Sequence, residues 1–455
     1  MTYQGRDHRT EQRKNTEKTP LTSVWQAPGY IPTLVAVACA FGSWSLLLPV
    51  VPSAVLDSGG GDLLAGATTG IFMAATVLTQ MCTPALLRRV GYNPVMVASA
   101  LMLGVPSLGY VMGMDAVPAL LFSALRGVGF GALTVAESAL VAELVPVRFL
   151  GKASGMLGVF IGLAQMVFLP LGLALAHTSL GYPGVYVIAA VVGVLAGVMC
   201  LRIPRIKASG AAPAEPSEAG KEAREEQQTR PLPAVSTWKL VTVPALAVTS
   251  ISMSFGAVSS FLPAAVKALD AELGALLAGF MLSIVGGASM IFRYFSGMIA
   301  DRRGTPGDLM IPGQILAGLG VALTAAVLMA EGSVWWLVLG AVAFGGGFGV
   351  VQNEALLSMF LRLPRSKVSE ASAIWNIAYD SGTGAGSFLL GAVAARAAYS
   401  GAFATAAALI AVGIALTAAD AIAGRHRLVE YHNTRARLRQ IPAARRAWRL
   451  VRRRR

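Results

Sequence analysis

Residues 297–304 read Gly-Met-Ile-Ala-Asp-Arg-Arg-Gly and close an apolar run near 273–298. The first glycine, Gly297, favours close approach of two helices, and Gly304 favours a tight turn. Asp301 between them can stabilise the N-terminus of a facing helix, while the arginines can pair with nearby carboxylates. The stretch therefore predicts a polar latch between helices, although an ordinary basic loop would also explain it.

Apolar runs of about 20 residues, the length that crosses a bilayer, recur on both sides of this stretch. Of the 455 residues, 55% are hydrophobic and only 13% are charged, whereas about a quarter are charged in soluble domains. The sequence therefore predicts an all-α polytopic membrane protein. Twelve spans are expected near 31–55, 63–87, 94–114, 117–142, 151–177, 183–203, 241–265, 273–298, 309–330, 334–359, 370–394 and 399–422.

Basic residues predict the orientation, because cytoplasmic loops collect Lys and Arg near the ends of spans. With the N-terminus inside, all but four of the 37 basic residues fall in the cytoplasm. We therefore expect a multi-pass protein of the cell inner (plasma) membrane with both termini cytoplasmic. The expected units are an N-terminal tail (1–30), a six-helix half (31–203), a linker rich in Ala, Pro and Glu (204–240), a second half (241–422) and a basic tail (423–455).

The two halves carry a sequence repeat. With an offset of 218 residues, GVGFG from Gly127 aligns with GGGFG from Gly345. With a slightly smaller offset, Arg89 aligns with Arg302. A series of matches in the same order predicts two six-helix halves of the same fold.

Two parallel six-helix halves resemble the architecture of the major facilitator superfamily, and the opening stretch resembles its cytoplasmic signature. The resemblance implies a secondary transporter whose substrate site lies at the membrane midplane between the halves. It also implies that Gly297, Asp301, Arg302 and Gly304 form a cytoplasmic gate. In the first half, Arg88 stands where the signature has aspartate. The sequence therefore does not decide whether the first half has a latch of its own.

Arg126 begins Arg-Gly-Val-Gly-Phe-Gly, which resembles the arginine motif in the fourth span of the superfamily's proton-driven exporters. Charges within spans are rare and usually face a cavity on a substrate or proton pathway. Glu137 lies on the same helix face, about 16 Å nearer the cytoplasm. Two other interpretations stay open: Arg126 as a structural tie between helices, and Glu137 as a latch instead of a relay.

Asn376, Tyr379, Asp380 and Thr383 occur at helical spacing and form one polar stripe on an otherwise apolar span. Asp380 is the best candidate for a proton carrier, because a buried carboxylate that gains and loses a proton can couple protonation to cavity opening. The alternative is a hydrogen-bonding seam between helices with no part in transport.

Arg293 and Glu354 are predicted at the cytoplasmic gate, near the inner ends of their spans, where the two charges could form an ion pair. Other aromatic and amide residues could line a drug-sized pocket or serve as interhelical contacts. These are Trp44, Gln80, Tyr110, Gln352, Asn353 and Trp375.

These features favour proton-coupled efflux of a small amphipathic organic compound by alternating access, the mechanism of an antiporter. Pro49 and Pro52 resemble the drug-exporter chains of the superfamily. The alternatives are uptake or facilitation of a small organic anion, with Arg126 as the carboxylate partner, and a non-transporting membrane receptor. The spans lack the residue sets of a metal site or a Ser-His nucleophile, so no enzyme activity, metal or cofactor is expected.

The expected partners are a small-molecule substrate, protons and membrane lipid, and the protein is expected to be a monomer. The tail from Gly424 to Arg455 contains twelve arginines. Beside the inner leaflet, a basic segment gains on the order of 1 kcal/mol per basic residue from anionic lipid. Lipid binding therefore explains the tail better than nucleic-acid binding; a disordered topogenic tail is the other interpretation.

Reporter fusions test the orientation. A reporter that requires the periplasm should be inactive when fused at Gly424, and a label near Glu215 should react only from the cytoplasmic side, because both positions fall in predicted cytoplasmic segments. Activity at Gly424, or loss of the cytoplasmic labelling, would contradict twelve spans in this orientation.

Overall fold

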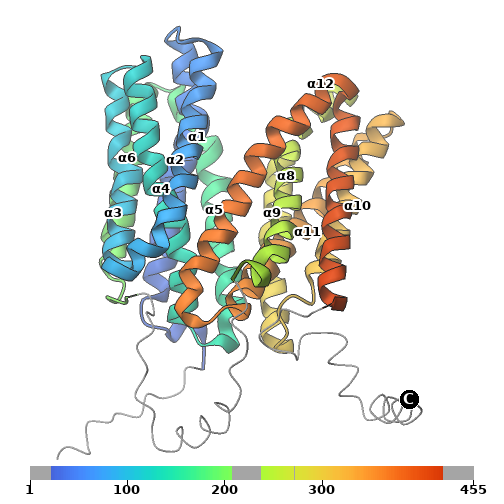
Figure 1. Ribbon diagram of the computed structural model, residues 1–455. Helices are drawn as coiled ribbons and strands as arrows, with labels where there is room; N and C mark the ends of the chain where they lie inside the picture. Colours follow the sequence, from blue (N-terminus) through green and yellow to red (C-terminus); the bar gives the residue numbers. More distant parts are fainter. Residues whose placement is uncertain (1–21, 208–236, 271, 424–455) are drawn as a thin grey trace, which may run out of the picture.

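The computed structural model describes residues 22–207, 237–270 and 272–423 (Figure 1). Most of the predicted N-terminal tail, of the linker and of the basic C-terminal tail lies outside the described residues. The expected lipid contact of the C-terminal tail falls there too.

Both halves are built from long helices. The first half contains α1 (Tyr30–Asp57), α2 (Gly61–Val90), α3 (Tyr92–Gly104) continued by the 3-10 helix η3 (Val105–Met112), α4 (Ala116–Leu144), α5 (Leu150–Ala176) and α6 (Gly181–Cys200). The second half contains α8 (Thr237–Leu269), α9 (Leu273–Arg303), α10 (Met310–Met329), α11 (Val334–Arg362) and α12 (Val368–Ala423). Short 3-10 helices are η2 (Val24–Gln26), η4 (Val147–Phe149) and η5 (Arg365–Lys367).

The helix labelled α12 consists of two spans. As one straight rod its 56 residues would extend about 84 Å, far beyond a hydrocarbon core of about 30 Å. The backbone leaves helical geometry at Ala397 (φ −126°, ψ 21°) and Ala398 (φ 56°, ψ −176°). Figure 1 shows the chain turning back at this point. With this break, the described residues contain the twelve spans that the sequence predicts.

Two segments differ from the prediction. The stretch 297–304 forms the end of α9 instead of a loop, and the helix ends only at Gly304, which adopts the left-handed conformation (φ 63°). Arginines in a last turn face the negative end of the helix dipole, which favours this extension. The third span changes to a 3-10 helix at Val105, because Pro106 lacks the backbone donor of an α-helical turn.

Glycines bring α4 into backbone contact with α2. A Cβ at Gly127 would lie 2.3 Å from the carbonyl oxygen of Phe72, and one at Gly131 would lie 2.3 Å from that of Thr76. No real side chain fits at such a distance. The GVGFG stretch is therefore a helix-packing motif, which is the usual role of small residues at spacing of four in membranes.

The second half repeats this contact between α11 and α9. A Cβ at Gly345 would lie 2.3 Å from the carbonyl oxygen of Val285, and one at Gly349 would lie 2.0 Å from that of Ser289. The contacting residues are those that the sequence offsets relate to the first half. The predicted repeat is thus present in the packing as well as in the sequence.

The two halves lie closest at one end of the molecule and diverge toward the other (Figure 1). The close end carries most basic residues of the described loops and helix ends, and we call it the basic end. It is marked by Arg88, Arg148, Arg202, Arg302 and Arg365.

Replacing Gly131 tests the packing motif. Gly131→Ala should force α4 away from α2 and destabilise the fold by about 1–3 kcal/mol, as overpacking does in tight cores. The control is Gly70→Ala on α2, where a Cβ meets nothing within 4 Å. Thermal unfolding of the purified protein measures both variants, and equal midpoints for the two would contradict the motif's role.

Candidate functional site

Six of the described helices form the main contacts between the two halves. α5 of the first half packs against α9 and, to a smaller extent, α11 of the second, and α12 packs against α2 and α4 of the first. We call these the α5–α9 contact and the α12 contact. Their polar and charged side chains make up the candidate site.

In the α5–α9 contact the two backbones touch at the basic end. A Cβ at Gly151 would lie 2.3 Å from the carbonyl oxygen of Gly297, and one at Gly297 would lie 2.1 Å from that of Gly151. One helical turn on, a Cβ at Gly155 would lie 3.0 Å from the Cα of Tyr294. Small residues on both helices therefore permit closure.

Asp301 lies against the first turn of α5. Its two carboxylate oxygens accept the backbone N–H groups of Gly151 and Lys152, each at 2.7 Å. These N–H groups have no acceptor within their own helix, and a negative charge there is favoured by the helix dipole. Arg302, one residue on, is exposed on the last turn of α9.

The α12 contact has the equivalent pair with the charges exchanged. Arg88, at the position of Asp301 in the repeat, donates to Glu370 at 3.2 Å. Glu370 stands in the first turn of α12 at the position of Lys152 in the first half. In the α5–α9 contact the acid is on α9 and the base on α5. In the α12 contact the base is on α2 and the acid on α12. The departure of Arg88 from the signature is thus compensated by Glu370.

Higher in the same contact, Asp380 bonds to the other half. Its Oδ2 accepts Gln80 Nε2 at 2.6 Å, and the same amide donates to Thr134 Oγ1 at 3.2 Å. One turn earlier on α12, Asn376 donates to the carbonyl oxygen of Thr134 at 3.2 Å. Asn376 and Asp380 therefore join α12 to α4 and α2.

A serine pair extends this row and was missed in the sequence. Ser372 and Ser138 share a hydrogen bond of 2.6 Å, and Ser372 also donates to the carbonyl oxygen of Val135 at 2.8 Å. Serines are common in apolar spans, so neither carries a strong signal by itself. The four-residue spacing of Ser372, Asn376 and Asp380 would have revealed the row.

The predicted polar stripe does not face one direction. The ring of Tyr379 stacks on Trp375 within the second half, with centroids 5.4 Å apart. Thr383 donates to the carbonyl oxygen of Tyr379, in its own helix. Of the four predicted residues, only Asn376 and Asp380 reach the first half, because they lie one turn apart on the face that α12 presents to α2 and α4.

Arg293 does not form the predicted ion pair with Glu354. It donates Nη1 to Gln352 Oε1 at 2.9 Å, and its guanidinium lies 5.8 Å from the ring centroid of Trp375. On the opposite side, a Cβ at Gly158 of α5 would lie 2.5 Å from its Cδ and Nε. Arg293 thus lies inside the α5–α9 contact.

Glu354 instead holds the loop that precedes α10. It accepts Ser296 Oγ at 3.3 Å and the backbone N–H of Gly307. The free N–H groups of this loop are better partners for a buried carboxylate than a side chain already engaged elsewhere.

Glu137 is buried, with 3% of its surface exposed, and its Oε2 has no hydrogen-bond partner among the described residues. It lies within electrostatic range of Arg293 on the other half. The structure thereby brings Glu137, predicted as a latch or relay of the first half, to the contact between the halves.

The sequence model of the Major Facilitator Superfamily matches residues 33–387, which is most of the chain. The chain belongs to the major facilitator superfamily. It is similar in structure to the human organic anion transporter MFSD10 (TETRAN), with a TM-score of 0.68, 15% identity and coverage of 85% of this chain and 98% of that one. It is also similar to the proton:xylose symporter XylE, with a TM-score of 0.68, 13% identity and coverage of 85% and 94%. This membership indicates a membrane-spanning secondary transporter.

Within the major facilitator fold, Arg126 lies inside the first half instead of between the halves. It donates to the carbonyl oxygens of Leu103 (3.0 Å) on α3 and Ser43 (3.4 Å) on α1. Its guanidinium lies 5.9 Å from the ring centroid of Phe72 and 6.0 Å from that of Tyr110. These contacts favour the structural interpretation of Arg126, a tie between helices of one bundle.

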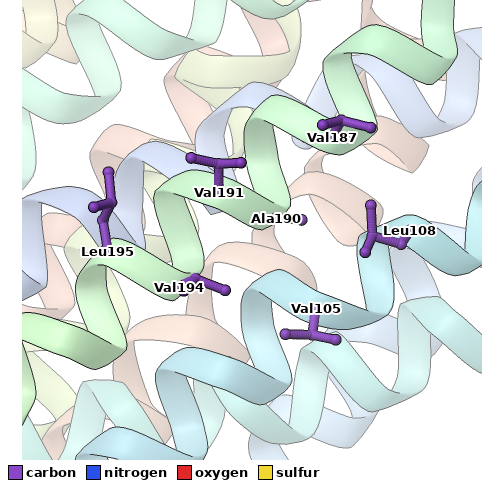
Figure 2. A pocket seen from close by; sticks show the side chains of 7 residues that line it. All are labelled: Val105, Leu108, Val187, Ala190, Val191, Val194 and Leu195. Atoms are coloured by element: carbon purple, nitrogen blue, oxygen red, sulfur yellow. The ribbon is translucent and has the colours of Figure 1, made fainter.

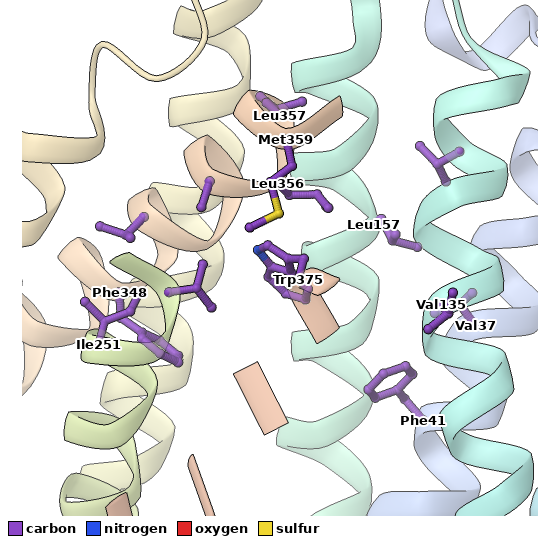
Figure 3. Close-up of a cluster of buried hydrophobic side chains, with 14 of the residues drawn as sticks. Val37, Phe41, Val135, Leu157, Ile251, Phe348, Leu356, Leu357, Met359 and Trp375 are labelled. Atoms are coloured by element: carbon purple, nitrogen blue, oxygen red, sulfur yellow. The ribbon is translucent and has the colours of Figure 1, made fainter. Parts of the chain in front are cut away.

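The superfamily repeat also produces two stacked aromatic pairs. Trp44 and Phe130 lie 4.9 Å apart between ring centroids on α1 and α4, and Phe255 and Phe348 lie 4.7 Å apart on α8 and α11. Phe130 and Phe348 are equivalent in the repeat, and each lies in the middle of a 29-residue helix. Figure 3 shows Phe348 and Trp375 in one apolar cluster with Leu157 of α5.

An apolar groove of about 280 Å³ lies apart from these contacts, between η3 and α6 (Figure 2). Its lining is aliphatic: Val105, Leu108, Val187, Ala190, Val191, Val194 and Leu195. Neither helix takes part in the contact between the halves, so the groove is not the candidate site. In the part of the chain that the structure describes, no three His, Cys, Asp or Glu side chains gather as a metal site would require.

A charge exchange tests the pair Arg88 and Glu370. Arg88→Glu should place like charges together and reduce the closed population at the basic end about fivefold or less, because an exposed ion pair contributes at most about 1 kcal/mol. Glu370→Arg should do the same, and the double exchange should restore closure.

The measurement is the distance between spin labels at the exposed positions Val90 and Arg365, in a cysteine-free background. Salt at 1 M should shrink the effect of each single variant, since the pair is exposed. A double exchange that is as open as the singles would show that the two residues do not act through each other.

Proposed function

We propose that this chain is a proton-coupled exporter of a small amphipathic organic compound, working by rocking of its two halves. The observation that supports the coupling is the bond between Asp380 on α12 and Gln80 on α2. It joins the two halves within the spans and contains the one titratable group of that row. We further propose that the protein lies in the plasma membrane with its basic end facing the cytoplasm.

Protonation of Asp380 acts directly on this bond. A bond from an amide to a carboxylate is charge-assisted and about twice as strong as a neutral one. Of the groups around Asp380, α2 presents Gln80 and α4 presents Thr134, both neutral, while Tyr379 is the titratable neighbour on α12. A proton taken up from outside would therefore weaken closure and favour opening toward the cytoplasm.

The aromatic pairs support an amphipathic substrate. They lie on α1, α4, α8 and α11, which are the most enclosed of the described spans. Trp44 and Phe255 are nevertheless partly exposed. Two repeat-related ring pairs near mid-membrane offer flat apolar surfaces to a compound bound between the halves, where transporters of this kind bind substrate.

Asp380→Asn tests the coupling without knowledge of the substrate. In the parent, the closed population at the basic end should fall as pH is lowered from 8 to 5, because the protonated acid is the weaker acceptor. The asparagine keeps the shape and a hydrogen bond but cannot release a proton, so its population should stay constant. The label pair at Val90 and Arg365 reports both.

Thr383→Val is the matched control, because this hydroxyl lies on the same helix and bonds only to its own backbone. It should keep the parental pH response. A parental response in Asp380→Asn would exclude this residue as the carrier and turn attention to Glu137 and Glu354.

A further inference from the structure

We propose that Arg293 binds an anionic group of the transported compound and that α5 of the other half covers this cation in the closed state. The proposal rests on the alternating-access function above and names the class of substrate: an organic acid whose carboxylate is attached to an aromatic or apolar body. In the alternative of organic-anion uptake, the sequence pointed to Arg126 as the carboxylate partner.

Arg293 is a buried cation whose hydrogen bonds are incomplete. Only 8% of its surface is exposed, one bond from Nη1 reaches the neutral amide of Gln352, and Nε is buried without a partner. No carboxylate of the described residues lies within 4.0 Å of it. A buried charge with these surroundings is costly, and a planar guanidinium matches a carboxylate in two parallel hydrogen bonds.

The neighbours of Arg293 suit the remainder of an organic acid. The guanidinium stands over the ring of Trp375, and this ring stacks on that of Tyr379. The ring centroids of Tyr379 and Phe348 lie 6.0 Å apart. A row of rings therefore leads from the cation to the pair Phe255 and Phe348 at mid-membrane. A compound with an acid at one end and an apolar body at the other matches this row.

Glu137 of the other half does not compensate the charge of Arg293. It is buried, one of its oxygens lacks a hydrogen-bond partner, and it forms no ion pair with Arg293 among the described residues. The place of an anion beside the guanidinium is therefore left to the transported compound.

α5 covers the cation in the closed state. The stem of Arg293 passes directly under Gly158, where a Cβ would lie 2.5 Å from it. Arg293 lies about 12 Å along α9 from Asp301, whose bonds to Gly151 and Lys152 hold α5 in place. Separation of α5 from α9 at the basic end therefore uncovers the guanidinium from that side. An exporter would load an anion there and release it on the other side after α5 returns.

Equilibrium binding to the full chain in lipid nanodiscs tests the assignment, with radiolabelled benzoate as the probe and benzamide as its neutral match. Benzoate should bind, and unlabelled benzoate but not benzamide should displace it. Arg293→Gln should weaken binding about tenfold, which is the range of a charge-assisted bidentate contact, and Arg293→Lys should restore only part of it.

Gly158→Ala, a change on α5 in the half opposite to Arg293, should alter benzoate binding. Gly162→Ala should not, because its Cβ would lie 3.4 Å from the flexible side chain of Met290. Arg126→Gln should bind as the parent does. The proposal fails if the parent does not bind benzoate, if benzamide competes equally, or if Arg293→Gln binds as tightly as the parent.

The same assay separates this proposal from the proton coupling. In an Asp380→Asn background, Arg293→Gln should still weaken benzoate binding about tenfold, while the closed population no longer follows pH. If Arg293→Gln binds benzoate as tightly as the parent but Asp380→Asn still loses its pH response, only the anion assignment is wrong. A parental pH response in Asp380→Asn, with the Arg293 effects present, would remove only the coupling.

Discussion

The backbone contact between Gly151 and Gly297 determines the arrangement of the other groups at the contact between the halves. A side chain at either position would push α5 and α9 apart by more than an ångström, because no Cβ fits beside the opposing carbonyl. At the observed separation Asp301 reaches the first N–H groups of α5, and Arg293 passes beneath Gly158. A small change in this one distance therefore acts at once on the latch and on the buried cation.

The repeat places equivalent helices in the two contacts but gives the contacts different electrostatics. Asp301 is held by backbone N–H groups at a helix end, a bond partly shielded from solvent. Arg88 and Glu370 form an ion pair with side chains 41% and 33% exposed, which salt screens. The α12 contact is then the one that ionic strength can loosen, and its upper part depends on Asp380 and Gln80. Closure on that side depends on an exposed ion pair, whereas closure at the α5–α9 contact depends on backbone packing and a shielded carboxylate.

Much of the fold followed from the sequence, because lipid leaves few alternatives for apolar runs of spanning length. Hydrophobic periodicity and residue spacing were enough to predict the twelve spans, the repeat and the role of residues 297–304 between helices. The partners of charged residues were not. Arg293 and Glu354 have no partner that their sequence neighbours would suggest. In the folded chain Arg293 bonds to the neutral amide of Gln352, and Glu354 accepts a backbone N–H of the loop before α10. Gln80 carried only a weak signal, since its importance comes from Asp380, 300 residues away.

Buried polar atoms without partners indicate that the closed state is not the best arrangement for every group at the contact. Gln80 Oε1, Glu137 Oε2 and Arg293 Nε are all buried and unbonded in the described structure. Each such atom costs about 1–3 kcal/mol, an amount comparable to the whole difference between two functional states of a protein. A second arrangement that satisfies these atoms would be close in free energy to the closed one. The three atoms belong to α2 and α4 of the first half and to α9 of the second, so movement between the halves changes the surroundings of all three.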